Sequence, residues 1–467
     1  MSFENEASYL IDTVEVTKLW GYYDIISKFE KDINIFIGIN GSYKTTFIML
    51  IYNLLTLNFT QLIDIDFEKI SIKIRKGRSY KYIVFSKSLN NYNEKVYTFS
   101  IKGVDEVTIS ERDLKVYGNQ IFDVDEEYDN EFISIKPLKS NMKSKFTILK
   151  NSLSQLVNVD YLAINRHCFS RRTPYFYEDN DNSIDKEIED LVAQFIKYQS
   201  EVKTSINNIS NNFFKKSFEK LLNNKTLKTT ISFDNNTPKK YKDFLNKMSK
   251  NPIFKGVDFN DAENYIDETD RLITEVVSGI SQDKIKQPIS TKLLLDNLNP
   301  QQTAKLISNL SNFPKIQIMY DLYEELEKKK QKLEEPTNQF IKISNDFIKS
   351  KLFPDKKIII TDDGSLKLQI SGNSRIPLYR LSSGEKQLII ILLRTLLQKG
   401  KKGIYITDEP ELSLHINWQE KLIFALNKIN PNSQLILATH SPDIVAEYEN
   451  KIKQMEDIIK YDKIATK

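Results

Sequence analysis

The feature that most constrains the fold is an apolar strand, residues 404–406, which leads into two adjacent acids, Asp408 and Glu409, with Pro410 directly after them. Parallel sheets present their ligand-binding groups at the carboxyl ends of their strands. Two acids at such a place suit a nucleotide site, where one holds a hydrated Mg²⁺ and the other polarises a water molecule. A surface acidic turn is the alternative, and the buried strand that leads into the pair argues against it.

A second strand, residues 33–37, leads into a glycine loop, and an apolar helix follows from Phe47 through Leu55. This order is the context that a phosphate-binding loop requires. Backbone amides surround the phosphates, Lys44 reaches the β- and γ-phosphates, and the Thr45 hydroxyl binds Mg²⁺. The candidate nucleotide-binding residues of this loop are Gly38, Asn40, Gly41, Ser42, Tyr43, Lys44, Thr45 and Thr46.

The loop departs from the usual pattern at Tyr43, where a glycine would let the backbone approach the phosphates closely. We expect a loop that binds nucleotide. The rate at which the protein hydrolyses ATP is left open by this tyrosine. A decayed loop, which binds weakly or does not hydrolyse, is the alternative.

Two more segments belong to the same pattern. Residues 381–387, Leu-Ser-Ser-Gly-Glu-Lys-Gln, form a small-residue turn that opens a helix, and the first N–H groups of a helix attract phosphate. Residues 434–439 form a buried strand that ends on His440. Together with residues 408–415, Asp-Glu-Pro-Glu-Leu-Ser-Leu-His, these segments resemble the signature motif, Walker B motif, D-loop and switch histidine of ABC-type ATPases. They are most similar to the bacterial branch related to SMC, DNA-repair and OLD-like ATPases.

This resemblance implies a role for each motif residue. Thr45 and Asp408 would hold Mg²⁺, and Lys44 would neutralise the phosphates of ATP. Glu409 would orient and polarise the attacking water, and His440 would contact the γ-phosphate. The signature residues would cap an ATP held by a second subunit, so that two ATP molecules are sandwiched in a homodimer or a higher oligomer. These signature residues are Ser382, Ser383, Gly384 and Glu385.

The resemblance also leaves three assignments open. The aromatic side chain that stacks on adenine would be Tyr22 or Tyr23, although packing in a β-sheet is at least as expected. Gln120 and Gln155 are both candidates for the Q-loop glutamine. His415 falls at a motif position, where a structural histidine is an equal alternative.

The order of the motifs implies an α/β fold, an ABC-type P-loop ATPase head with an antiparallel β-subdomain and an inserted helical, short coiled-coil-like arm. We expect an N-terminal lobe at 1–182, the helical arm at 183–350 and a C-terminal lobe at 351–467. Residues 60–165 are interpreted as strands and turns. Apolar residues at spacings of three and four predict one long helix from Ser183 and a second from Ile316, which Pro336 kinks or restarts.

Composition excludes several classes of protein. Hydrophobic residues make up 40% of the chain and charged residues 28%, which is typical of a soluble globular protein. Cys168 is the only cysteine, so no intrachain disulfide can form, which fits a cytoplasmic location. The N-terminus lacks the pattern of a signal peptide, and no apolar run approaches the roughly 20 residues of a membrane span.

Residues 201–256 contain twelve lysines against four acids, although the net charge of the whole chain is only +4. Together with nearby phenylalanines, this segment could hold a nucleic-acid backbone such as DNA. A solvated helix surface over a stripe of core phenylalanines is the alternative.

Several outputs of an ATP-driven cycle compete. A transporter motor would separate Lys44 from Ser382 by a much shorter chain. We expect no TOPRIM nuclease domain after the ATPase head, because only 27 residues follow His440 in this sequence. We expect the sensor or scaffold ATPase of an anti-phage system, similar to the ATPase subunits of PARIS or Septu systems. Such a subunit would hold or activate a separate effector, a TOPRIM or HNH nuclease, in response to a phage-encoded trigger. A DNA-repair ATPase that binds DNA is the alternative, and a structural role without hydrolysis is a further one.

Overall fold

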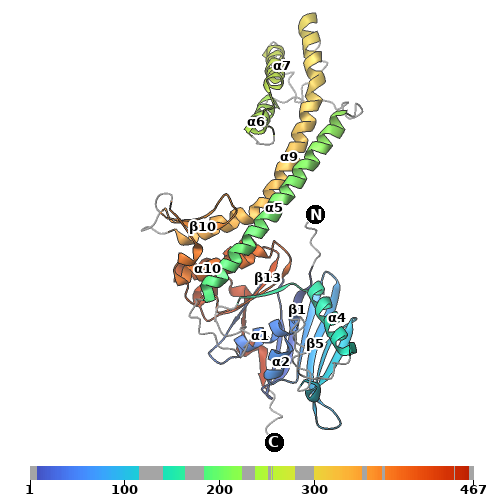
Figure 1. The fold of residues 1–467 in the computed structure, drawn as a ribbon, viewed down its shortest axis with the longest axis vertical. Helices are drawn as coiled ribbons and strands as arrows, with labels where there is room; N and C mark the ends of the chain where they lie inside the picture. The colour runs from blue at the N-terminus through green and yellow to red at the C-terminus, as the bar shows by residue number, and fades with distance from the viewer. Residues whose placement is uncertain are drawn as a thin grey trace, which may run out of the picture. The chain divides into compact units, whose positions relative to one another are not determined.

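The computed structural model describes residues 8–114, 140–162, 183–222, 237–250, 254, 256–278, 299–349, 355–370, 374–445 and 447–461. Gln120 therefore lies outside the described residues. The chain forms two compact units, one of Met1–Gln199 with Pro336–Lys467 and the other of Ser200–Glu335 (Figure 1).

A parallel sheet of five strands organises the first unit, in the order β14-β3-β13-β12-β8. Its strands are β14 (Ile452–Gln454), β3 (Ile33–Ile37), β13 (Ser433–Ala438), β12 (Gly403–Asp408) and β8 (Val159–Leu162). The central strands β12 and β13 are buried almost throughout, because both faces of a parallel sheet are covered. This explains why they read as continuous apolar runs in the sequence.

The register of this sheet brings three motifs to one edge. Asp408 on β12 pairs with Ala438 on β13, and Ala438 pairs with Phe36 on β3. All three strands run in the same direction, so the residues that follow them meet at their common carboxyl edge. The phosphate loop, the acid pair and the switch histidine therefore come together from distant parts of the chain.

A second sheet of seven strands is antiparallel, in the order β15-β2-β1-β4-β5-β6-β7. Its strands are β15 (Ile459–Tyr461), β2 (Tyr23–Lys28), β1 (Leu10–Leu19), β4 (Lys69–Lys76), β5 (Ser79–Leu89), β6 (Lys95–Ile101) and β7 (Asp105–Ser110). One apolar core contains residues of both sheets and of helix α1 (Lys44–Leu55). The predicted α/β class with an antiparallel β-subdomain is confirmed.

The prediction of only strands and turns for residues 60–165 is wrong in part. Helix α4 (Ser140–Leu156) lies within this region, and helix α2 (Phe59–Asp64) covers its first residues. The buried residues of α4 are Phe146, Leu149 and Leu153, at spacings of three and four. This helical period was therefore present in the sequence, in a segment otherwise rich in polar residues.

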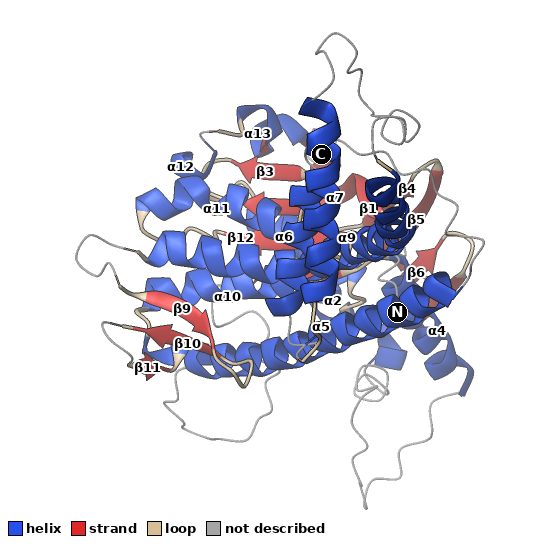
Figure 2. Ribbon diagram, turned by 90° about the horizontal axis from the view of Figure 1, so that it is seen from above, coloured by secondary structure: helices blue, strands red, loops and turns tan. Residues whose placement is uncertain are grey.

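Helices also complete the carboxyl-terminal part of the first unit. Helix α10 (Ser383–Leu397) packs on α11 (Ile416–Ile429), and the two are drawn beside the parallel strands in Figure 2. A small antiparallel sheet has the order β11-β10-β9. Its strands are β9 (Lys357–Ile360), β10 (Leu366–Gln369) and β11 (Arg375–Ile376).

Two long helices, α5 (Ser183–Leu222) and α9 (Pro300–Ile348), belong partly to each unit, as predicted for a helical arm. In the first unit, the Phe195 and Phe340 ring centroids lie 6.2 Å apart, and Gln199 donates a hydrogen bond to Thr337. Helix α9 continues through Pro336 and does not restart there.

The second unit also contains helices α6 (Thr237–Lys250) and α7 (Asn260–Ser278). Phe213 lies in its apolar core with Phe244 and Tyr323, and Phe214 packs against this core, whereas Phe218 is 69% exposed. Among the described helices of both units, none is at once long enough and apolar enough to cross a lipid bilayer.

Candidate nucleotide site

The phosphate loop joins β3 to α1 and has the backbone that phosphate binding requires. Gly41 has φ +83°, a conformation that side chains disfavour, and Lys44 is the first residue of the helix. Asn40, Gly41 and Thr45 are exposed, whereas Ser42 and Lys44 are buried. The first N–H groups of α1 are therefore available to an anion above the loop.

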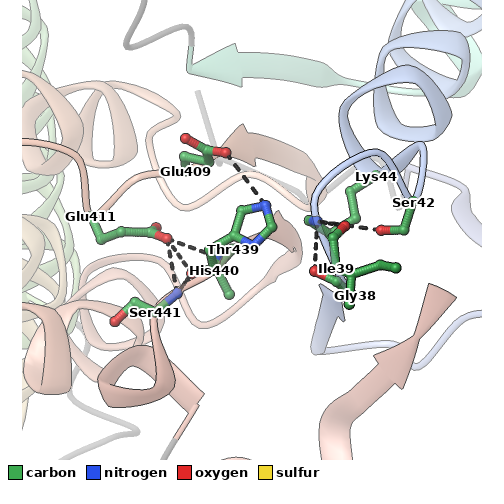
Figure 3. A network of polar contacts seen from close by, with 9 residues as sticks. All are labelled: Gly38, Ile39, Ser42, Lys44, Glu409, Glu411, Thr439, His440 and Ser441. Carbon is green, nitrogen blue, oxygen red and sulfur yellow. Dashed lines mark hydrogen bonds and ion pairs between the residues drawn. The ribbon is translucent and has the colours of Figure 1, made fainter. Parts of the chain in front are cut away.

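The ammonium group of Lys44 lies inside this loop. It donates to the carbonyl oxygens of Gly38 at 2.9 Å and Ile39 at 3.3 Å, and to Ser42 Oγ at 3.4 Å (Figure 3). Burial lowers the pKa of Lys44, while the nearby carboxylates of Glu409, Glu456 and Asp408 oppose this shift. The ammonium group of Lys44 therefore lies close enough to Asp408 and Glu409 to interact with their charges, although these residues are far apart in the sequence.

Tyr43 adopts a left-handed backbone conformation, which favours glycine. Its φ of 62° and ψ of 22° are left-handed, which costs an ordinary residue about 1–2 kcal/mol. The ring packs on Tyr23, with centroids 5.3 Å apart, and burial raises the pKa of the Tyr43 hydroxyl. The tyrosine thus preserves the path of the loop while its ring lies towards the antiparallel sheet.

Asp408 ends β12 next to the phosphate loop. Burial raises its pKa to about 6, and the charges of Glu409 and Glu411 add to this rise, although a hydrogen bond from Thr45 and the charge of Lys44 oppose it. One carboxylate oxygen, Oδ1, is buried and has no hydrogen-bond partner among the described residues. An oxygen in this state, beside a threonine hydroxyl, is a ready ligand for a cation.

Thr45 and Asp408 fit the requirements of Mg²⁺, which usually takes one or two carboxylate or hydroxyl ligands and completes its shell with water and phosphate oxygens. The part of the chain that the structure describes contains no cluster of three or more histidine, cysteine, aspartate or glutamate side chains suited to a metal.

Glu409 and His440 face each other across the site. Glu409 Oε1 lies 3.8 Å from His440 Nε2, and both side chains are about one-third exposed (33% and 37%) (Figure 3). Glu409 has a positive φ of 46°, and its N–H donates to Ala438 O at 2.8 Å. The Glu409 backbone is therefore in the left-handed region, and its carboxylate lies beside the histidine ring.

Glu411 is a part of the site that the sequence analysis missed. Only 8% of it is exposed, and its Oε1 accepts hydrogen bonds from the Thr439 hydroxyl and from the N–H groups of His440 at 3.0 Å and Ser441 at 3.2 Å. The acid stands inside the D-loop motif, but its partners are distant in sequence. The signal available in the sequence was a third acid, Glu411, close behind the acid pair and between a strand and a helix.

The signature turn begins α10 with a capping box. Glu385 accepts from the N–H of Ser382 at 3.0 Å and from its hydroxyl at 2.9 Å, and Lys356 Nζ lies 2.6 Å from the other oxygen. Burial favours a raised pKa for Glu385, but these donors outweigh it and lower the pKa. Ser382 and Ser383 are exposed, so the turn can meet a ligand from outside.

Gly384 has a steric role within its own subunit. A Cβ atom at this position would lie 2.5 Å from the carbonyl oxygen of Ser413, closer than any ordinary contact. Only glycine allows the signature turn to pack against the D-loop here. The polar contacts of Ser382 and Glu385 do not include the phosphate loop, where Lys44 makes its own hydrogen bonds.

The remaining candidates are placed as follows. His415 is exposed and caps α11, where its Nδ1 accepts from the N–H of Asn417 at 3.3 Å. Gln155 is exposed near the end of α4, before β8, and so at the amino edge of the parallel sheet, away from the phosphate loop. Tyr22 lies in the turn after β1, and its ring stacks on Tyr461 with centroids 6.3 Å apart.

Comparison with protein families gives one match that covers most of the chain. Residues 11–445 match the model of the AAA ATPase domain. Among curated proteins, the chain is 28% identical over 200 residues to the retron Vc95 probable ATPase of Vibrio cholerae serotype O1 biovar El Tor. This alignment covers 39% of the chain and 35% of the relative.

Two further relatives are more distant or shorter matches. The retron Ec83 probable ATPase of Escherichia coli is 27% identical over 164 residues, which cover 34% of the chain and 30% of that protein. The Septu protein PtuA of Bacillus thuringiensis is 34% identical over 88 residues, which cover 16% of the chain and 22% of that protein. The predicted resemblance to Septu ATPases is confirmed, although the chain spans only about a third or less of the length of these relatives.

Among solved structures, the Smc head domain of Pyrococcus furiosus, bound to the C-terminal domain of ScpA, aligns over 97% of the chain and 96% of its own. Its sequence identity is 14% and its TM-score 0.40. The Smc head of Pyrococcus yayanosii aligns over 94% of the chain and 93% of its own, with 13% identity and a TM-score of 0.34.

Proposed function

This chain belongs to the AAA ATPase domain family, and from that premise we propose that it binds ATP with Mg²⁺ and hydrolyses it to ADP and phosphate. The observation that carries the proposal is the convergence of a buried lysine, an acid pair and a histidine at one edge of the parallel sheet. These groups lie far apart in the sequence, and phosphoryl transfer needs little more than their positioning and charge.

Each group has a defined task in this proposal. Lys44, on the loop carbonyls, neutralises the β- and γ-phosphates, and the amides of residues 41–46 surround them. Thr45 and Asp408 hold Mg²⁺, which when bound spreads the negative charge of the phosphates. Glu409 accepts a proton from the attacking water, and His440 donates to the γ-phosphate.

The same proposal includes an ATP-bound homodimer or higher oligomer. Ser382 and Ser383 are exposed, and their helix start is separate from the phosphate loop of their own subunit. A second subunit would bring its signature turn to the nucleotide. Leu412, in the segment 408–415, and Ile416, at the start of α11, are apolar and 38% and 51% exposed, which suits burial in such an interface.

The role that we propose for this cycle is that of a sensor or scaffold subunit in an anti-phage system. The names of the relatives, two retron ATPases and a Septu protein, support it. The chain would hold or activate a separate effector, a nuclease of TOPRIM or HNH type, and respond to a phage-encoded trigger. Isolation of the chain with a nuclease from its native host would support this role, and a chain that purifies without any partner would oppose it.

A DNA-repair ATPase remains the second candidate, through the lysines of residues 201–256. Several of these lysines are already engaged within the second unit. Lys216 lies 3.9 Å from Glu325, Lys242 pairs with Asp267, and Lys240 lies 4.3 Å above the Tyr320 ring. These contacts favour a helix surface satisfied within the unit. Tight binding of duplex DNA by the purified chain, lost at high salt, would favour the second candidate.

The proposed ATPase activity is tested by Glu409→Gln. We expect at least a 100-fold loss of phosphate release, because the amide cannot accept the proton of the attacking water. Binding of a fluorescent ATP analogue should stay within about threefold of the wild type, because the side chain does not hold the nucleotide. Equal turnover by both proteins would refute the assignment, and the exposed Glu420→Gln on α11 serves as the control.

A further inference from the structure

The loop between β12 and α11 holds His440 from two sides. On one side, the carboxylate of Glu409 lies 3.8 Å from the ring nitrogen Nε2. On the other, Glu411 Oε1 accepts the N–H of His440 at 3.0 Å and that of Ser441 at 3.2 Å (Figure 3). The same oxygen also accepts the hydroxyl of Thr439, so a single carboxylate holds three consecutive residues.

The switch residues also make hydrogen bonds that do not involve Glu411. The Ser441 N–H donates to Thr439 Oγ1 at 2.9 Å, and the Ser441 hydroxyl donates to Gln419 Oε1 at 2.7 Å. Strand β13 ends at Ala438, and helix α12 (Pro442–Val445) begins only at Pro442. The Thr439 N–H still bonds to Phe36 O at 3.1 Å, which continues the sheet by one residue. The N–H of His440 donates to Glu411, and that of Ser441 donates both to Glu411 and to Thr439 Oγ1, so this acid is one of the groups that set how the chain leaves the strand.

Glu411 occupies this position with one oxygen left unpaired. The residue is 8% exposed, and its second oxygen, Oε2, is buried and has no hydrogen-bond partner among the described residues. A buried carboxylate oxygen without a donor costs free energy, and a neutral side chain could anchor a turn without this penalty. Such conflicts with stability are typical of functional sites.

We propose that Glu411 is a positioning residue for the reaction: it fixes the backbone of the switch so that the His440 ring faces Glu409 and the γ-phosphate. The proposal rests on the ATPase function proposed above and adds a residue to which that function assigned no role. Glu411 does not touch the nucleotide in this scheme. It acts through His440, because its hydrogen bonds end on residues 439–441.

Kinetics of single and double variants test this inference. Glu411→Gln keeps the shape of the side chain but weakens its acceptor, and we expect kcat to fall about 10- to 100-fold, since small misplacements of a reacting group have effects of this size. KM for ATP should change by less than about threefold, because binding groups are untouched. The exposed Glu420→Gln should match the wild type.

The decisive comparison is between His440→Ala and the double variant Glu411→Gln/His440→Ala. If Glu411 acts through the histidine, the second substitution adds less than about a twofold loss to the first. If the loss of kcat in the double variant equals the product of the losses in the two single variants, the proposal is overturned. A large rise in KM with unchanged kcat in Glu411→Gln would also overturn it.

A spectroscopic measurement separates this inference from the ATPase proposal. The chain has three histidines, so the ring signals of protein labelled with [¹³C]histidine can be assigned with one substitution each. In Glu411→Gln, we expect the His440 signal to shift or broaden while that of His415 stays in place. An unchanged His440 signal would refute the positioning role. Absence of ATP turnover in the wild type would refute only the proposed reaction.

Discussion

At the scale of single residues, the site combines acids that repel one another. Asp408 is the clearest case, because burial first, and then the charges of Glu409 and Glu411, raise its pKa to about 6 from an ordinary value of 3.8. The folded state therefore binds a proton more tightly than the unfolded state does. Above about pH 6, where Asp408 is ionised in both states, this difference destabilises the folded protein by at most about 3 kcal/mol.

The first prediction follows from the destabilising effect of the ionised Asp408 carboxylate. Asp408→Asn should raise the melting temperature of the nucleotide-free protein at pH 8 by about 2–4 °C, allowing for the partial exposure of the group. The gain should shrink as the pH is lowered from 6 towards 4, because the wild-type carboxyl then takes up its proton in the folded state. Thermal denaturation in EDTA at pH 8 and pH 5 measures it. An equal gain at both pH values would contradict the charge argument.

The same variant should lose stabilisation by Mg²⁺ and ATP. In the wild type, ligand binding raises the melting temperature by mass action, and Asp408 is one of the residues proposed to hold the cation. The increment on adding Mg²⁺ to an ATP analogue should fall by more than half in Asp408→Asn. An undiminished increment would remove Asp408 from the metal site.

At the scale of elements, the phosphate loop has a left-handed residue directly before Lys44, and this residue is Tyr43 where a glycine is usual. Tyr43 has φ 62°, and its ring packs on Tyr23. We expect Tyr43→Gly to change ATP affinity by less than about threefold, whereas Tyr43→Val should weaken it about tenfold or more, because a β-branched residue is forced out of the left-handed region. Titration with a fluorescent ATP analogue measures both, with Tyr43→Phe as the control that keeps the ring. A large effect of Tyr43→Gly would instead assign the ring a direct role at the nucleotide.

The sequence could predict the strands of the site but not the contacts between its loops. The apolar runs that end on Gly38, Asp408 and His440 predicted parallel strands, and the sheet register then brings their ends together. The role of Glu411 could not be derived in this way, since its hydrogen bonds depend on how two loops approach each other in space. Similarly, the sequence contains a glycine at position 384, but only the structure shows why a side chain does not fit there. A Cβ atom would collide with the carbonyl oxygen of Ser413.

At the scale of the whole molecule, the proposed cycle needs two copies of the chain. The phosphate loop and the signature turn stand on different elements of the same unit, and each has its own hydrogen bonds. If each ATP is shared between the phosphate loop of one subunit and the signature turn of another, a defect in either motif removes activity, but two different defects can compensate in a mixed dimer.

Complementation between two inactive variants tests this arrangement. Lys44→Ala removes the phosphate-loop cation, and Ser383→Arg places a large charge on the exposed signature turn without removing the Ser382–Glu385 cap. Each variant alone should release phosphate at a rate at least about 20-fold below the wild type. A mixed dimer contains one site with both motifs intact, so an equal mixture should recover about one-quarter of wild-type turnover, because half of randomly formed dimers are mixed and each has one working site. Recovery should rise with protein concentration, because association limits it. A mixture no more active than its components would place both motifs at the nucleotide of a single subunit.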